Sequence, residues 1–262
     1  MNIKEKTINI SKNTLLLTWT INPQIWKTIK YKNSLNPKVR IKEYIKSLFF
    51  YITISDFDNI VFCENSNYKC EEYMKNINHI AKLYNKNFEF LQFIWNHKET
   101  IQRKTYSYWE WEILDYAFNN SKLLKQSKSR YKITWRYIIY NINDIIKSSQ
   151  NTENLLFRWL WSFSFFSIDT SLFKVSNEVY KKYLYDSKIL TEKNKCVEKI
   201  FYEKLNWKDI NFWKLEVLPK KDWYWDDWHY ENIYHHILLK LWFRNMKNIV
   251  MLFLSRLYNF IK

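Results

Sequence analysis

Polar side chains able to bind a nucleotide follow three short apolar runs of this sequence. They are Thr18, Thr20 and Asn22 at the end of the run 14–18, Glu64 and Asn65 after 59–63, and Arg136 after 131–134. Open α/β sheets bind ligands where the carboxyl ends of parallel strands meet. There a tight loop can bring backbone N–H groups up to a phosphate or a base, a carboxylate can accept hydrogen bonds from a ribose or a base edge, and a guanidinium can bind a diphosphate with two hydrogen bonds. The alternatives are ordinary polar turns and a surface arginine.

Carboxylates gather where we expect a helix to begin, near residue 111. Glu112 and Asp115 are three residues apart and so share a helix face, whereas Glu110 lies near the N-terminus, where the helix dipole favours negative charge. Substrate binding is one interpretation and helix capping is the other. With glycine in place of Trp109 and Trp111 the segment would read Y-G-E-G-E, which forms a loop more readily than a helix.

A third group lies in the acidic stretch 222–231 and contains Asp226, Asp227 and His229. A carboxylate near a histidine can act as a general base, and carboxylates can help to hold a divalent cation. His229 has no second histidine at a metal-ligand spacing, so no metal ligand is assigned. We expect Asp226 or Asp227 to act as the base and His229 to bind substrate. Capping of the last helix is the alternative.

Strand and helix patterns alternate along the first half of the chain. Apolar runs predict strands at 14–18, 59–63, 88–94 and 131–134, and helical spacing predicts helices at 40–54, at 71–84 and from about residue 111. Short connections between alternating strands and helices are typical of a parallel sheet with right-handed crossovers. The expected fold class is therefore α/β, a mostly parallel Rossmann-like sheet flanked by helices.

The alternation loosens after residue 141. We expect a helix at 142–149, sheet within 155–166, helices at 177–185 and 193–205, a strand at 212–218 and a long C-terminal helical extension. No internal repeat or low-complexity linker interrupts this order. One continuous domain is expected, with a ligand-binding half at 1–140 and a second half at 141–262.

The chain has no glycine and 14 tryptophans. Average usage would give roughly 18 glycines, which turns with positive φ require. Several tryptophans stand where a turn favours glycine: Trp207 follows an asparagine, Trp19 lies between two threonines, and Trp228 follows two aspartates. We therefore expect that the gene comes from an organism reading UGA as glycine, and that these codons were read here as tryptophan. A protein that is truly rich in tryptophan is the alternative.

The net charge of +16 by itself favours a nucleic-acid partner. The lysines, however, are scattered among asparagines, isoleucines and tyrosines, a composition typical of an AT-rich genome, so nucleic acid is not the expected partner. Cys63, Cys70 and Cys196 form an odd set without a disulfide framework, which favours a reducing cytosol.

The C-terminal stretch 240–262 alternates basic with apolar residues. Its longest apolar run, 249–254, is far shorter than the roughly 20 residues that span a bilayer. Neither end carries a secretory signal. The pattern suits a helix lying in a membrane interface, so we expect a cytoplasmic protein that binds the inner face of the membrane peripherally. A last helix packed on the core is the alternative.

Four stretches together carry a family resemblance. They are LLLTWTINP, NIVFCENSNY, YSYWEWEILDYAFNNSKLL and YKITWRY. In order and spacing they resemble a group of bacterial glycosyltransferase-like proteins found with capsule and lipopolysaccharide biosynthesis genes. That group has glycine where Trp19, Trp109, Trp111 and Trp135 stand here, in agreement with the UGA hypothesis. The match covers roughly residues 14 to 140.

The resemblance implies a GT-A-like fold, with a nucleotide-sugar-binding half followed by an acceptor half. It implies that Thr18, Thr20 and Asn22 line the nucleotide pocket, that Glu64 and Asn65 face the base or ribose, and that Arg136 binds the phosphates. Many GT-A enzymes have an Asp-x-Asp metal motif where this chain has Thr134-Trp135-Arg136. A divalent cation is therefore in doubt, and Arg136 is expected to supply the positive charge.

The resemblance further implies transfer of a sugar from a nucleotide-sugar donor to a surface-polysaccharide or lipid-linked acceptor. The alternative is a basic binding module without enzymatic activity, for nucleic acid or an anionic membrane, in which aromatic side chains stack on bases.

Overall fold

The structure is a computed structural model that describes residues 13–22, 36–95, 106–134, 137–158, 168–185, 187–193 and 197–205. The expected strand at 212–218, the acidic stretch 222–231 and the C-terminal helical extension lie outside these residues, as do Arg136 and most of the tryptophans.

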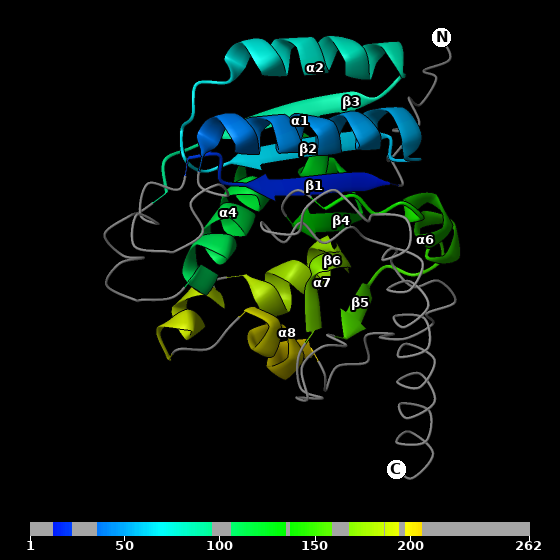
Figure 1. The fold of residues 1–262 in the computed structure, drawn as a ribbon. Coiled ribbons are helices and arrows are strands. Elements are labelled where there is room, and N and C mark those ends of the chain that lie inside the picture. The colour runs from blue at the N-terminus through cyan, green and yellow to red at the C-terminus, as the bar shows by residue number, and fades with distance from the viewer. Residues whose placement is uncertain are drawn as a thin grey trace, which may run out of the picture.

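A mostly parallel sheet forms the centre of the described chain (Figure 1). Its strands are β1 (Thr14–Trp19), β2 (Asn59–Glu64), β3 (Asn87–Gln92), β4 (Ser129–Thr134), β5 (Leu155–Arg158) and β6 (Ile168–Ser176), in the spatial order β3-β2-β1-β4-β6-β5. β1 to β4 pair in parallel, whereas β6 pairs antiparallel with β4 and β5 antiparallel with β6. This arrangement confirms the expected α/β class. The sheet joins strands from both sides of residue 140, while the division into two halves there stays a prediction.

Several helices begin where the local sequence provides hydrogen bonds or negative charge for the first backbone N–H groups. They are α1 (Pro37–Ile54), α2 (Glu71–Leu83), α4 (Tyr106–Asn120), α5 (Lys122–Gln126), α6 (Ile142–Ser148), α7 (Asn177–Val179) and α8 (Val197–Leu205). A π-helical turn at Tyr180–Leu184 and a 3₁₀ helix at Ser187–Lys193 lie between α7 and α8. The Asn36 side chain accepts a hydrogen bond from the Lys38 N–H at the start of α1, and Glu71 and Glu72 open α2.

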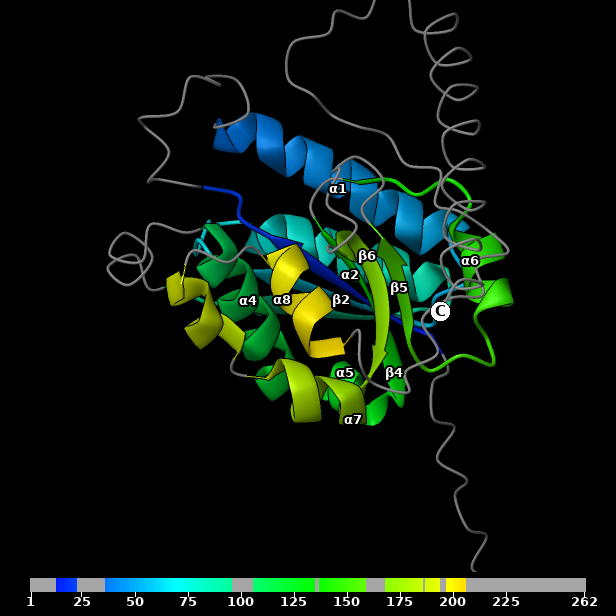
Figure 2. The same ribbon diagram turned by 90° about the horizontal axis from the view of Figure 1, so that it is seen from below.

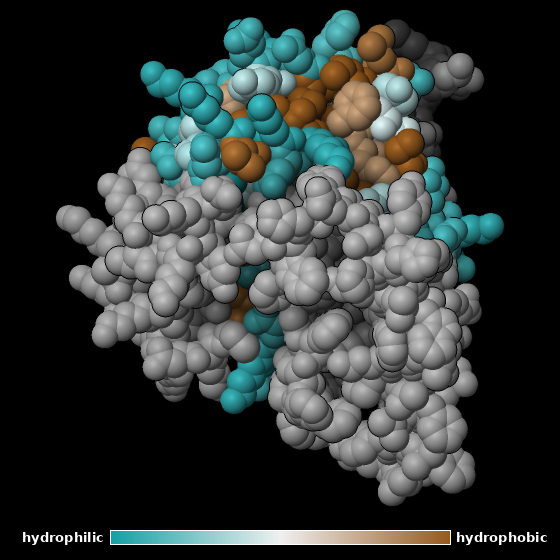
Figure 3. All heavy atoms as spheres, viewed as in Figure 1, coloured by the Kyte–Doolittle hydropathy of each residue, from teal (hydrophilic) through white to brown (hydrophobic). Residues whose placement is uncertain are grey.

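Helices cover both faces of the sheet (Figures 1 and 2). On one face α1, α2 and α6 pack on β1, β2 and β4 through a core that includes Leu15, Leu17 and Phe62. On the other face α4, α5, the π-helical turn and α8 pack on a second core that includes Leu16, Val61 and Phe173. Side chains alternate across a strand, so neighbouring residues of β1 serve opposite cores. The outer face of α1 carries hydrophobic side chains among hydrophilic ones (Figure 3), with Phe49 and Ile54 exposed.

Most predicted elements agree with the structure to within a few residues, and β6 is the principal omission. The region predicted as one helix at 177–185 begins with α7 and continues as the π-helical turn. β6 was missed because its sequence, IDTSLFKVS, places polar residues at five of its nine positions. Even so, Lys174 and Ser176 are buried.

The described tryptophans do not stand at bends. Trp19 ends the extended strand β1, and Trp109 and Trp111 lie inside α4. Positive φ occurs among the described residues at Asn67 and Asn85. The expectation that Trp19 occupies a turn needing glycine is therefore wrong in its geometry. Its indole is buried and stacks on Tyr44 with 4.3 Å between ring centroids.

Candidate functional site

The carboxyl ends of β1, β2 and β4 lie level with one another. Thr18 is paired with Cys63 of β2 and with Thr134 of β4, and Trp19 is paired with Glu64. β2 and β4 lie on opposite sides of β1, so the strand order reverses between β1 and β4. Ligands of open α/β sheets bind outside the strand ends at such a switch point. The predicted residues on β1, β2 and their exit loops therefore share one edge of the sheet.

Glu64 is the centre of a hydrogen-bonded hub at this edge. Its Oε1 accepts hydrogen bonds from the Ile21 N–H at 3.1 Å, the Ser66 N–H at 2.8 Å and the Ser66 hydroxyl. Its Oε2 accepts from the Tyr68 N–H at 3.2 Å and from the Gln92 amide at 3.1 Å. The side chain is fully buried. These donors come from the exits of β1 and β2 and from the end of β3, so Glu64 fixes three strand ends relative to one another.

Thr20 is held from two directions. Its hydroxyl donates to the Asn65 side-chain oxygen at 2.7 Å. Its carbonyl accepts hydrogen bonds from Arg40 Nη2 at 2.7 Å and from the Tyr44 hydroxyl at 3.0 Å, both on α1. Beside it, the Asn22 N–H donates to the Ser66 hydroxyl at 2.9 Å. The exit loop of β1 is thus locked in position before any ligand arrives.

Arg40 is a buried cation at this edge that sequence reasoning missed. It is 6% exposed, and its Nε also donates to the Thr20 carbonyl, at 2.9 Å. The sequence places it in the first turn of α1, where a basic residue usually points to solvent. Tyr44, one helical turn later, was the available signal, because an i, i+4 pair on the buried side of a helix can meet.

The Asn65 amide is a donor at the same edge without a hydrogen-bond partner among the described residues. Asn65 is fully buried, and its Nδ2 makes no hydrogen bond in this part of the chain. A buried polar group left unpaired costs about 1–3 kcal/mol. A ligand acceptor at the exit of β2 would remove that cost.

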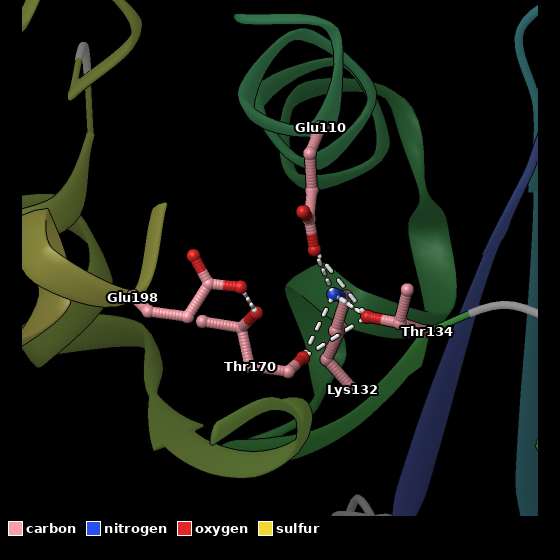
Figure 4. Close-up of polar contacts among 5 residues, drawn as sticks. All are labelled: Glu110, Lys132, Thr134, Thr170 and Glu198. Atoms are coloured by element: carbon pink, nitrogen blue, oxygen red, sulfur yellow. Dashed lines mark hydrogen bonds and ion pairs between the residues drawn. The ribbon is translucent and has the colours of Figure 1, made fainter. Parts of the chain in front are cut away.

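A second polar group, the Lys132 cluster, lies where β4 ends and β6 begins. It contains Glu110, Lys132, Thr134, Thr170 and Glu198 (Figure 4). Lys132 is fully buried, and its ammonium donates to Glu110 Oε1 at 2.5 Å, to the Thr170 carbonyl at 3.0 Å and to the Thr134 hydroxyl. The Thr134 hydroxyl lies 3.0 Å from the Thr170 carbonyl, and the Thr170 hydroxyl donates to Glu198 Oε1 at 3.2 Å. The cluster ties α4, β4, β6 and α8 together.

Lys132 was also missed, although the sequence carried a signal. A lysine in the middle of a strand expected to be buried on both faces needs a carboxylate partner. Glu110 was predicted to bind substrate, but its pairing with Lys132 was not predicted. The structure places its carboxylate within the cluster, on the α4 side of the sheet edge.

The neighbouring carboxylates of α4 differ in position. Asp115 is buried, and its Oδ1 accepts a hydrogen bond from the Tyr180 hydroxyl at 2.5 Å. Burial and this carboxylate raise the pKa of Tyr180 well above its ordinary value. Glu112 is half-buried. Both side chains face contacts within the protein, and the role of Glu112 in substrate binding stays a prediction.

Several predicted site residues lie outside the part of the chain that the structure describes. Asp226, Asp227, His229 and Arg136 lie outside the described residues. Within the described part of the chain, no three His, Cys, Asp or Glu side chains are grouped so that they could hold a metal ion. None of the described helices is both long enough and apolar enough to cross a membrane. The described cysteines Cys63 and Cys70 are buried and are not joined in a disulfide.

Known proteins resemble the chain in structure but not in sequence. No family model and no curated protein matches the sequence. The glycosyltransferase GlyE of Streptococcus pneumoniae TIGR4 matches with a TM-score of 0.52 and 8% identity, over 78% of this chain and 46% of GlyE. The mannosyltransferase Ktr4p of S. cerevisiae matches with a TM-score of 0.43 and 12% identity, over 73% of this chain and 62% of Ktr4p.

The likeness to GlyE concerns the fold. It supports the GT-A-like form of the α/β class, in which a mostly parallel sheet carries its polar residues at the carboxyl edge. The chain spans about half the length of GlyE.

Proposed function

We propose that this protein transfers a sugar from a nucleotide-sugar donor to a surface-polysaccharide or lipid-linked acceptor. The observation that carries the proposal is the edge at the switch point between β1 and β4. There a hydrogen-bonded exit loop, the buried Asn65 amide, which is unpaired among the described residues, and the Glu110 carboxylate share one sheet edge in a fold similar to that of a glycosyltransferase. A nucleotide sugar needs such a combination of backbone and side-chain groups.

In this proposal different residues bind different parts of the nucleotide-sugar donor. Thr18, Thr20 and Asn22 line the nucleotide pocket. Asn65 binds the base or ribose, and Glu64 acts on the same side by fixing the loops, because its own oxygens are engaged by five donors. Arg136 stabilises the leaving diphosphate, a charge effect worth on the order of a hundredfold in rate.

The residues proposed to activate the acceptor lie in the second half of the chain. We propose that Asp226 or Asp227 removes the proton of the acceptor hydroxyl, with His229 and Glu112 binding substrate nearby. No residue described here is assigned to a divalent cation, and Arg136 supplies the positive charge in its place.

Binding is the first test. The protein is titrated calorimetrically with nucleoside diphosphates and nucleotide sugars that cover the common bases and hexoses. Binding of at least one diphosphate, weakened by Asn65→Ala and by Arg136→Ala, supports the proposal. If no member of the panel binds, the proposal fails.

We also propose that the printed tryptophans stand for glycines encoded by UGA. Besides composition, one observation supports this: the indole N–H groups of Trp19 and Trp111 are buried without an acceptor among the described residues. The packing of the Trp19 indole against Tyr44 and Phe62 favours the alternative, a genuine tryptophan at this position. Sequencing the gene decides the matter, because a majority of UGG codons at the 14 positions would refute recoding.

The proposal also includes the location of the protein in the cell. We propose a cytoplasmic protein bound peripherally to the membrane through the basic amphipathic stretch 240–262. Co-sedimentation with vesicles should require anionic lipid and should be lost when residues 240–262 are deleted. Binding that is equal on neutral vesicles would contradict an electrostatic contribution.

A further inference from the structure

Lys132 has no capacity left for a ligand. Its ammonium carries three protons, and three acceptors surround it: Glu110, Thr134 and Thr170. The side chain is 1% exposed, and the Phe173 ring lies 5.5 Å from the nitrogen. The cation therefore acts through the groups that it holds, and the carboxylate of Glu110 is the charged one.

Glu110 is held on one side only. Its Oε1 accepts hydrogen bonds from Lys132 at 2.5 Å and from the Thr134 hydroxyl at 3.3 Å, whereas Oε2 has no hydrogen-bond donor among the described residues. The side chain is 20% exposed. Figure 4 shows this second oxygen turned away from Lys132, on the side from which Glu198 approaches. An acceptor fixed in direction, with an unused oxygen, is suited to binding hydroxyl groups.

The position of Glu110 matches the sugar part of a donor. Thr134 ends β4 beside Thr18 of β1, so the carboxylate adjoins the edge where Thr20 and Asn65 lie. Glu198 lies one residue further from Lys132 in the cluster, where it accepts a hydrogen bond from the Thr170 hydroxyl. The negative charge of the partly exposed Glu110 carboxylate disfavours a second carboxylate, such as that of a hexuronic acid, at this point.

We propose that the open oxygen of Glu110 binds hydroxyl groups of the donor's sugar, and that the site takes a neutral hexose rather than a hexuronic acid. Lys132 is a positioning residue that keeps Glu110 in place. This inference rests on the proposed function, since it assigns the sugar within the same donor site.

Three ligands that share one nucleotide test the proposal: the free diphosphate, a diphosphate hexose and the matching diphosphate hexuronate. Calorimetry on the wild-type protein should show the hexose donor binding at least tenfold more tightly than the hexuronate donor. Glu110→Gln should weaken hexose-donor binding about tenfold to a hundredfold, the range of a charge-assisted hydrogen bond. Its affinity for the free diphosphate should not change.

Control variants separate the sugar contact from a general loss of charge or structure. Glu72→Gln removes an exposed carboxylate on α2 and should leave all three affinities unchanged. Lys132→Met should lower hexose-donor affinity, and Lys132→Arg should restore part of it. Circular dichroism checks the fold of each variant.

The outcomes separate the two proposals. If the wild-type protein binds the free diphosphate but binds hexose and hexuronate donors equally, the inference is overturned and the proposed function stands. The same holds if Glu110→Gln leaves hexose affinity unaltered. If no diphosphate binds, the proposed function fails, and this inference fails with it.

Discussion

Two carboxylates at the same edge of the sheet are used in opposite ways. Glu64 is fully buried, and five donors from its own chain occupy both of its oxygens. Glu110 is partly exposed and uses one oxygen on Lys132 and Thr134. A carboxylate saturated by backbone N–H groups builds the site, whereas one held on a single side remains available to a ligand. Residue type and position in the sequence do not distinguish the two roles.

The cations beside them show a related difference. Arg40 directs its guanidinium to the backbone carbonyl of Thr20 and so shapes the exit of β1. Lys132 directs its ammonium to a carboxylate and so sets a charge in place. The first arrangement defines the path of the chain, and the second defines the chemistry presented at the β4–β6 end of the edge.

The largest effect is expected from removing the Glu64 hub. Glu64→Ala leaves three backbone N–H groups without an acceptor and should lower the free energy of unfolding by about 3–5 kcal/mol. Urea denaturation measures it. Glu72→Ala, on the exposed side of α2, is the matched control and should change stability by less than about 0.5 kcal/mol. Equal losses from the two variants would remove the distinction between the two carboxylates.

The pairing of Lys132 with Glu110 should appear as a coupling energy. A double-mutant cycle of Lys132→Met and Glu110→Gln should give about 1–3 kcal/mol, since the cation is buried but water reaches the carboxylate. Denaturant unfolding of the four proteins supplies the values. Additive effects of the two substitutions would mean that the contact contributes nothing.

Lys174 is a buried lysine that has no carboxylate in hydrogen-bond contact within the part of the chain that the structure describes. It donates to the Ser149 carbonyl at 2.8 Å, and burial lowers its pKa from 10.5 to about 8. Between these values the unfolded chain binds a proton that the folded chain lacks, so stability should rise with pH from about 8 to about 10.5. Lys174→Met should flatten this rise and add about 1–2 kcal/mol near pH 7. Thermal unfolding across the pH range tests it, and an unchanged slope in the variant would be the contrary result.

The smallest effect is expected at Thr20. Thr20→Val removes the hydrogen bond to Asn65 and should lower the free energy of unfolding by about 1 kcal/mol. Nucleoside diphosphate affinity should fall more visibly, because Asn65 then loses its orientation. Thr53→Val, at a half-buried position of α1 where the hydroxyl donates to the Phe49 carbonyl, serves as the comparison. A variant that binds diphosphate as the parent does would exclude Asn65 from the nucleotide pocket.

Much of the sheet could be predicted because its strands are short apolar runs. The apolar runs at 14–18 and 59–63 gave β1 and β2, and helical spacing gave α1. β6 escaped prediction because Lys174 and Ser176 have the polarity of surface residues, and their partners, Ser149 just after α6 and Asn154 just before β5, are more than 20 residues away. Burial of a polar side chain depends on contacts that are distant in sequence, and local patterns do not contain them.

For the candidate site, too, the location could be predicted from the sequence, whereas the roles of its residues could not. Its location followed from the rule that strand ends bind ligands, and Thr20, Glu64 and Asn65 do share that edge. The roles within it depended on which donors surround each oxygen, and for Glu64 two of the five donors come from residues 43 and 28 positions away. Arg40 and Lys132 were missed for that reason. The turn geometry assigned to Trp19 was wrong because an apolar side chain fits the end of a buried strand equally well.

The Glu64 hub also bears on how the chain assembles. Two of its five donors arrive from Ile21, 43 residues earlier, and from Gln92, 28 residues later, so the set of donors is complete only when β1, β2 and β3 have all paired. A pairing that slipped by one residue would bury the charge with fewer donors and would be disfavoured. The buried carboxylate therefore favours the correct register of the three strands.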